Sequence, residues 1–306
     1  MANTKKVKWK RHKKVKVPWA EYDKSRRDDC KRVLDLRKKF KKLDKPVQRR
    51  EFKLSCMVVL VLFKVLLNQS YRTIWSLSGT FQLWAVLGFK RNPCYKTIQN
   101  TMAYLDAEIL ELINRSLIPR HARLCGVDSS GIRTTRKGAW VIVTFKRRMR
   151  KKDFKKVHIF VDLEKKKILA CIITGGTIYD GRQLRRMLRM CMWIRIEIVL
   201  GDGGYDSRNC FNDIAGINAR PGIKVRKNST TKSKHCPSRK WAVIAQKENY
   251  DKWKEDLEYT MRCVVEAIFS AMKRRYGEIV HSIKRKYRKV EIWIRTIIWN
   301  VCIYPR

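Results

Sequence analysis

The order of apolar segments after Pro119 is the sequence feature that most limits the fold. Short β-rich runs alternate there with helical stretches, and glycines, turns or capping residues separate them. Strands are predicted at residues 124–128, 140–145, 157–161, 168–174, 194–200 and 222–225. Helices are predicted at residues 182–192 and 207–214, in the long segment that contains 259–273, and at 288–304. Together these segments predict an α/β fold in which helices cover both faces of a mixed sheet.

The residues before Pro119 predict only helices. The apolar run 54–67 is shorter than the roughly 20 residues that a membrane-spanning helix needs, so we predict a buried helix. Ser70 is placed to cap a helix that begins at Tyr71. Later short helices are joined by turns and resemble a helix-turn-helix, in which the exposed residues would be Tyr95, Lys96, Gln99 and Asn100. The alternative is a plain helical bundle that supports the following domain.

The charge of the chain indicates a polyanionic partner. There are 72 Lys and Arg residues against 27 Asp and Glu, which gives a net charge of +45 and a pI near 10.3. Folding does not need this charge, because like charges repel one another in a compact state. A nucleic-acid phosphate backbone is the commonest partner of such a surface. The 44% hydrophobic content excludes a merely disordered basic protein.

The cysteines and the N-terminus limit the cellular location. Ten cysteines are scattered singly with no C-x-x-C pair, which argues against a zinc ribbon and suits a reducing cytoplasm. The basic N-terminal residues are not followed by the apolar stretch of a signal peptide. The sequence therefore predicts a soluble, cytoplasmic protein.

Two acids directly follow predicted buried strands. Asp128 lies in Val-Asp-Ser-Ser-Gly, and Asp202 lies in Gly-Asp-Gly-Gly-Tyr-Asp-Ser. A hairpin followed by helix, strand, helix, strand and helix is the element order of a ribonuclease H-like fold. That fold can bring both acids together with a helical acid, for which Glu266 is the candidate. Three carboxylates in one cleft need cations, and hard oxygen ligands select Mg²⁺ or Mn²⁺. Two such ions would support phosphoryl transfer.

Glu266 and three other polar residues share one side of a predicted helix. Tyr259, Arg262, Glu266 and Lys273 fall at roughly 0°, −60°, −20° and −40° when successive residues are about 100° apart. The apolar residues Met261, Val264, Val265, Ile268, Ala271 and Met272 fall on the other side. We therefore expect a helix that packs through its apolar side and presents the polar stripe away from the core. Arg262 and Lys273 would suit phosphates.

These motifs resemble those of the DDE transposases of bacterial and archaeal insertion sequences. The signature Tyr-x-x-Arg-x-x-x-Glu-x-x-x-x-x-x-Lys of their large group four and group five families is matched without a gap by the stripe residues. The contexts of Asp128 and Asp202 resemble the first and second Asp of the family, and the likeness extends from about residue 54 to the end. Where many relatives have His-Asp-Ser, this chain has Tyr179-Asp180-Gly181, so we predict that Asp180 is a helix cap rather than a catalytic group. Asp206 is likewise predicted to be an N-cap rather than a metal ligand.

Composition and pattern divide the chain into a basic N-terminal arm at 1–50, a helical, helix-turn-helix-like DNA-binding region at 51–119 and a ribonuclease H-like catalytic domain at 120–306. The arm is heavier than the family needs, and its alternatives are an arm that follows DNA phosphates and a solvated tail. The resemblance assigns Asp128, Asp202 and Glu266 to a triad that holds two Mg²⁺ or Mn²⁺ ions.

By the same resemblance, Tyr259, Arg262 and Lys273 would position the transposon end. The protein would cut DNA and join it to a target, as a homodimer associated with a prokaryotic nucleoid. Two rival functions stay open: an inactive or domesticated DNA-binding protein, and a ribonuclease H-like nuclease without strand transfer.

Overall fold

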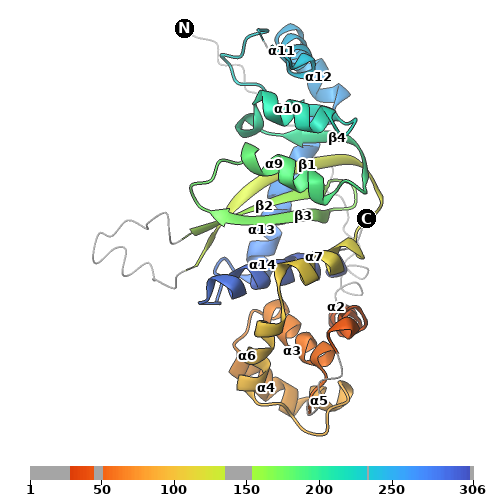
Figure 1. Ribbon diagram of the computed structural model, residues 1–306, viewed down its shortest axis with the longest axis vertical. Coiled ribbons are helices and arrows are strands. Elements are labelled where there is room, and N and C mark those ends of the chain that lie inside the picture. The colour runs from red at the N-terminus through yellow and green to blue at the C-terminus, as the bar shows by residue number, and fades with distance from the viewer. Residues whose placement is uncertain (1–27, 45–50, 135–153, 233, 304–306) are drawn as a thin grey trace, which may run out of the picture.

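A computed structural model describes residues 28–44, 51–134, 154–232 and 234–303 (Figure 1). Most of the predicted N-terminal arm and the whole predicted strand at 140–145 lie outside these ranges.

A five-stranded mixed sheet forms the centre of the fold. The strands are β1 (His121–Arg133), β2 (Phe154–Asp162), β3 (Lys167–Gly175), β4 (Arg195–Gly201) and β5 (Arg220–Ile223), in the spatial order β3-β2-β1-β4-β5. The pairs β1–β2 and β2–β3 are antiparallel, whereas β1–β4 and β4–β5 are parallel. The predicted hairpin and mixed sheet are confirmed.

Helices cover both faces of the sheet because successive strand residues point to opposite sides. On one face, Cys125, Val127 and Phe160 join a hydrophobic cluster with α9 (Gly181–Met190) and α10 (Arg208–Ala215). On the other face, the neighbouring strand residues pack with α13 (Cys263–Tyr276) and α14 (Arg285–Cys302). Helices therefore bury both faces of the mixed sheet. This is the predicted ribonuclease H-like architecture.

The first part of the chain is helical, as predicted. Its elements are α2 (Asp29–Asp35), η1 (Leu36–Leu43), α3 (Leu54–Leu66), α4 (Tyr71–Thr80), α5 (Leu83–Val86), α6 (Tyr95–Asn100), η2 (Thr101–Tyr104) and α7 (Ala107–Arg115). The Ser70 cap is confirmed, since its side chain accepts a hydrogen bond from the Thr73 amide at 3.1 Å. Helices α3 to α6 lie at one end of the long axis, and α10 to α12 lie at the other end (Figure 1).

Helix α3 is buried along its whole length. Within the described ranges, no single helix is long and apolar enough to cross a membrane, although α3 and α4, bent by 113° at their junction, pass that test as a pair.

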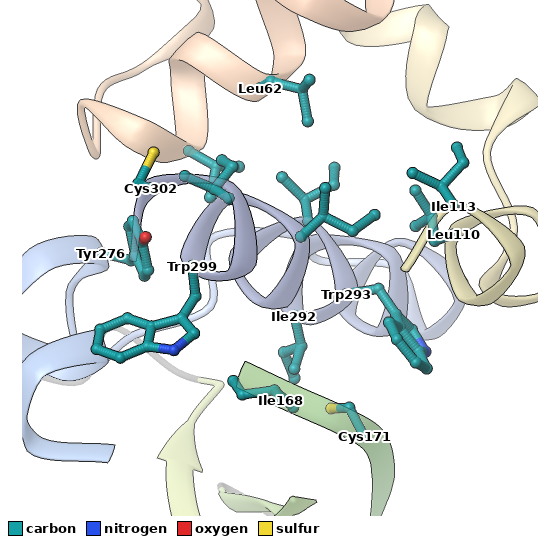
Figure 2. Packing of buried hydrophobic residues seen from close by; sticks show 14 of the residues in the cluster. Leu62, Leu110, Ile113, Ile168, Cys171, Tyr276, Ile292, Trp293, Trp299 and Cys302 are labelled. Atoms are coloured by element: carbon teal, nitrogen blue, oxygen red, sulfur yellow. The ribbon is translucent and has the colours of Figure 1, made fainter. Parts of the chain in front are cut away.

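Helix α14 joins the helical region to the sheet. Figure 2 shows its side chains between Leu62 of α3, Leu110 and Ile113 of α7, and Ile168 and Cys171 of β3. Asn300 adds polar specificity, because its side chain accepts from the Ile168 amide at 2.8 Å and donates to the same residue's carbonyl at 2.8 Å. The helix therefore ties both parts of the chain into one core.

The long segment before α13 is divided, where the sequence predicts one long helix. It forms α11 (Pro237–Glu248), α12 (Tyr250–Asp256) and the 3-10 turn η5 (Tyr259–Arg262) before α13 begins. The Asn249 side chain caps α12 by accepting from the Lys252 amide at 2.9 Å. Glu258 has φ +49°, which no continuous right-handed helix allows. These two residues separate the pieces.

A buried ionic cluster holds α14 against α3. The Glu291 carboxylate lies 3.8 Å from Lys64 Nζ and 3.2 Å from Arg295 Nη2, and all three side chains are almost wholly buried. Burial opposes ionisation of Glu291, but the charges of Lys64 and Arg295 and the hydrogen bonds from Ser282 and His281 outweigh it and lower its pKa.

Substitution of this acid should destabilise the whole fold. We expect Glu291→Ala to lower the free energy of unfolding by about 3–5 kcal/mol, because two cations would stay buried without their counter-charge. The measurement is urea denaturation at neutral pH. Glu108→Ala, at an exposed position of α7, is the control and should change stability by less than about 0.5 kcal/mol.

Candidate active site

Asp128 and Asp202 lie side by side because of the register between β1 and β4. Asp202 directly follows β4, as the sequence predicts, whereas Asp128 lies within β1 and not at the predicted end of a strand. These strands are parallel, and Gly126 pairs with Leu200. Asp128 and Asp202 follow two residues later on each strand, so both side chains point to the face covered by α13. Asp128 Oδ1 accepts from the Ser129 amide at 2.7 Å, and Asp202 Oδ1 accepts from the Gly204 amide at 2.9 Å.

A glycine lets α13 approach this pair. A Cβ atom on Gly126 would lie 2.7 Å from a Val265 methyl group and 2.8 Å from one of Leu163, closer than real side chains pack. With glycine at this position, Val265 sits directly over β1, and the first turns of α13 reach the strand ends. Any larger residue would push the helix and its Glu266 away from Asp128.

Arg262 bridges two of the predicted triad acids. Its Nη2 donates to Glu266 Oε1 at 2.7 Å, and its Nη1 lies 3.7 Å from Asp128 Oδ2. The Glu266 side chain is 56% exposed, whereas that of Asp128 is 20% exposed. The structure thus brings Asp128, Asp202, Glu266 and Arg262 to one place, with Glu266 on the open side.

The carboxylates of this cluster repel one another. Burial raises the pKa of Asp128, and the charges of Asp202 and Glu266 raise it further. The Ser129 amide and the Arg262 guanidinium oppose the rise without cancelling it. The site therefore carries more negative charge than its own cation balances.

The donor set fits a hard divalent cation, since it consists of carboxylate oxygens. In the described part of the chain, however, no three acidic, His or Cys side chains are grouped closely enough to hold an ion as they stand. The Arg262 guanidinium pairs with Glu266 and lies near Asp128, so a metal would need Glu266 to turn away from this cation. Asp128, Asp202 and Glu266 are the residues that would hold it.

The remaining stripe residues face the sheet, where the sequence predicts that they point away from the core. Tyr259 is buried, and its hydroxyl donates to the Gly201 carbonyl at 3.1 Å. Burial raises its pKa to about 12. Lys273 Nζ donates to Ser130 Oγ at 2.8 Å. The helical periodicity correctly places the four stripe residues on one side of the segment. It cannot indicate that this side faces β1, where Val265 packs over Gly126.

Asp180 does not cap a helix, so the prediction of a capping role is wrong. It precedes α9 without a side-chain capping bond. Its carboxylate instead lies 2.7 Å from Lys156 Nζ and 3.2 Å from His158 Nδ1. The fully buried His158 also shares a 2.9 Å hydrogen bond with Thr174 Oγ1. These groups lie on the α9 side of the sheet, so they pack against the face opposite Asp128.

Asp206 is not an N-cap either. Ser207 caps α10 by accepting from the Cys210 amide at 3.2 Å, while Asp206 accepts from Arg239 Nε at 2.7 Å. Sequence reasoning missed the partners of both Asp180 and Asp206, because they lie 22 to 33 residues away and no local pattern marks them.

Asp180 should make stability depend on pH. Burial opposes its ionisation, but hydrogen bonds from His158, Lys156 and Ser129 outweigh it and lower the pKa to about 2. A lowered folded-state pKa stabilises the protein above the unfolded pKa of about 4, and this contribution is lost as the pH falls towards 2. We expect Asp180→Asn to cost about 2 kcal/mol at pH 6, with the difference from wild type shrinking below pH 4 in urea titrations.

Asp213→Asn is the matched control for that experiment. Burial is the main cause that raises the pKa of Asp213, and Arg185 opposes it. A group whose pKa is raised in the folded state stabilises the protein at low pH, and this contribution to the free energy of unfolding is lost as the pH rises through the folded-state pKa. Asp213→Asn should therefore be at least as stable as wild type at pH 6, and this gain should disappear towards acid, whereas Asp180→Asn should be less stable at pH 6. A loss of stability at pH 6 in both variants would contradict the assignment.

A family described as "Transposase DDE domain" matches residues 119–301. No curated protein matches the sequence closely enough to count as a relative.

Two solved structures align weakly with the chain. "Mos1 transposase paired-end complex with left transposon end" is 9% identical, covers 85% of this chain and 82% of its own, and has a TM-score of 0.24. "Crystal structure of a pre-cleavage Mos1 transpososome" is 11% identical, covers 84% and 79%, and has a TM-score of 0.22.

Proposed function

The chain belongs to the transposase DDE domain family, and from this premise we propose that it is an insertion-sequence transposase with the Tyr-Arg-Glu-Lys signature. The DDE domain is the catalytic part of transposases, so the protein is a phosphoryl-transfer enzyme. The proposed reaction is cleavage of DNA at the ends of the element, followed by joining of the freed 3′ hydroxyl to target DNA. The observation that carries the proposal is that Asp128 and Asp202 follow the parallel pairing of β1 with β4 on the face covered by α13, where Arg262 links Asp128 to Glu266.

Asp128, Asp202 and Glu266 would hold two Mg²⁺ or Mn²⁺ ions. Bound there, the ions would supply Lewis acidity at the scissile phosphate and lower the pKa of a water or hydroxyl nucleophile. Asp128 and Asp202 contribute rigid oxygens, because backbone amides already fix their carboxylates. Glu266 contributes an exposed and more mobile one.

The stripe cations would bind the DNA end. Arg262 can exchange its carboxylate partners for the two oxygens of a phosphate without losing its fork geometry. Lys273 contributes a point charge from the next turns of α13. Tyr259 holds η5 against the carbonyl of Gly201, beside Asp202, and so positions Arg262. These roles of Tyr259, Arg262 and Lys273 are part of the proposal.

The rest of the chain would supply further DNA contacts. The proposed division is an arm at 1–50, a helical DNA-binding region at 51–119 and the catalytic domain at 120–306. On α6, Tyr95, Lys96, Gln99 and Asn100 are all exposed and could meet a groove or a backbone. A homodimer that holds both element ends, in the cytoplasm near the nucleoid, completes the proposal.

Loss of the second strand-end acid should stop the chemistry while leaving DNA binding intact. We expect Asp202→Asn to lower the Mg²⁺-dependent cleavage rate at least about 1000-fold, since each 1.36 kcal/mol of lost transition-state stabilisation costs tenfold. Affinity for the same duplex, measured with metal chelated, should be unchanged or higher. Asp106→Asn removes only the charge of the residue that caps α7, since the Asn oxygen can accept the same hydrogen bond, and this variant should cleave normally. Cleavage by Asp202→Asn at the wild-type rate would refute the triad.

One product separates the transposase from its rivals. In a mixture of labelled element ends, a second duplex and Mg²⁺, a transposase yields a joined strand. A ribonuclease H-like nuclease would yield only cut ends, and a domesticated binding protein would yield neither. Removal of the metal with a chelator should abolish both products while leaving a complex whose affinity falls steeply with salt.

A further inference from the structure

A long stretch beside the catalytic strands contains no acidic residue. No Asp or Glu occurs between Asp213 and Glu248. The same stretch contains the cations Arg220, Lys224, Arg226, Lys227, Lys232, Lys234, Arg239, Lys240 and Lys247. The basic segment, as we call residues 224–240, begins directly after β5, ends in the first turn of α11 and carries most of them. Its charge has no local counterpart, so like charges within it repel one another.

The described part of the basic segment is anchored to the turn that follows β4. Asp206, whose side chain is 1% exposed, is the anchor. Its carboxylate accepts from Arg239 Nε at 2.7 Å, from Ser229 Oγ at 2.8 Å and from the Arg226 amide at 3.0 Å. Arg239 Nη2 also donates to Ser229 Oγ at 3.0 Å. One buried acid therefore holds both ends of the segment.

The anchor belongs to the turn that carries Asp202. Asp206 follows Asp202 by four residues, and the 3-10 turn η4 (Gly203–Tyr205) joins them. Arg226 Nε donates to the Gly203 carbonyl at 3.3 Å, and the Lys224 amide donates to the Gly201 carbonyl at 3.2 Å. The basic segment thus rests directly on the backbone around the proposed catalytic acid.

Apart from Arg239, the cations of the basic segment lie at the protein surface. Lys224, Arg226, Lys227, Lys232, Lys234 and Lys240 are exposed. Asp206 balances about one charge, and its pKa is lowered because Arg239 and the other donors outweigh the effect of burial. The remaining positive charge needs an external polyanion.

We infer that the basic segment is a phosphate-binding surface that holds the DNA backbone next to Asp202, and that Asp206 is the positioning residue that fixes this surface relative to the active site. The inference rests on the proposed function for the identity of the polyanion. It adds to the stripe cations a second DNA-contacting element next to Asp202. Asp206 acts through Arg239 and not as a metal ligand.

Charge removal tests the surface. The variant Lys227→Gln/Lys232→Gln/Lys234→Gln should bind a short duplex more weakly with metal chelated. The slope of log affinity against log salt should become shallower by about 2 to 3, since each lost phosphate contact contributes about 0.9. The control Lys165→Gln/Lys166→Gln/Arg195→Gln removes the same charge at the opposite ends of the strands. An equal change of slope in both variants would overturn the inference.

Loss of the anchor tests the role of Asp206. In both Asp206→Ala and Arg239→Ala, amide hydrogen exchange over residues 224–232 should accelerate, and metal-free DNA affinity should fall. Arg239→Ala keeps the acid, so it separates anchoring from metal binding. If Asp206→Ala lost Mg²⁺-dependent cleavage but kept wild-type exchange and binding, Asp206 would be a ligand and the inference would be wrong.

These results are distinguishable from failure of the proposed function. If the wild-type protein neither binds nor cuts DNA, the function fails and the surface loses its partner. If the wild-type protein cuts and joins DNA while the triple Lys variant binds with the wild-type salt slope, only the inference fails.

Discussion

The parallel pairing of β1 with β4 is the interaction on which the rest of the structure depends. It links two strands that are more than 60 residues apart in the chain and sets Gly126 opposite Leu200. From this register follow the shared direction of Asp128 and Asp202 and the space over Gly126 that α13 occupies. A shift of one residue in the register between β1 and β4 would turn one aspartate to the α9 side of the sheet. The two carboxylates would then lie on opposite faces.

Much of this could be predicted from the sequence because the relevant signals are local. The hairpin, the buried strand before Asp202, the cap at Ser70 and the final helix each depend on neighbouring residues. The breaks at Asn249 and Glu258 were missed, because one polar cap and one left-handed residue hardly alter the helical pattern. The sequence also could not indicate the direction of the stripe, since the position of Val265 over Gly126 is a tertiary contact.

The buried acids show why partners were harder to predict than positions. Asp180, Asp206 and Glu291 all occupy places where a short sequence window suggests a cap or a solvated face. Each instead pairs with cations from distant elements, namely Lys156, Arg239 and Lys64. In a chain with 72 basic residues, many cations could form an ion pair with a buried carboxylate, and only the tertiary fold determines which one does. These pairs therefore fix how helices and strands dock, at a desolvation cost that simple apolar packing would avoid.

The ion pairs of Arg262 with Asp128 and Glu266 compete with the binding of a metal ion at these carboxylates. The guanidinium is covalently tethered within reach of Asp128 and Glu266, so its effective concentration there far exceeds that of any dissolved ion. It also cannot lose its proton, so a change of pH does not remove it. We expect that a divalent cation could bind these carboxylates only if something else occupied the fork of the arginine at the same moment. A phosphate group can do so, and the substrate would then help to open the site that acts on it.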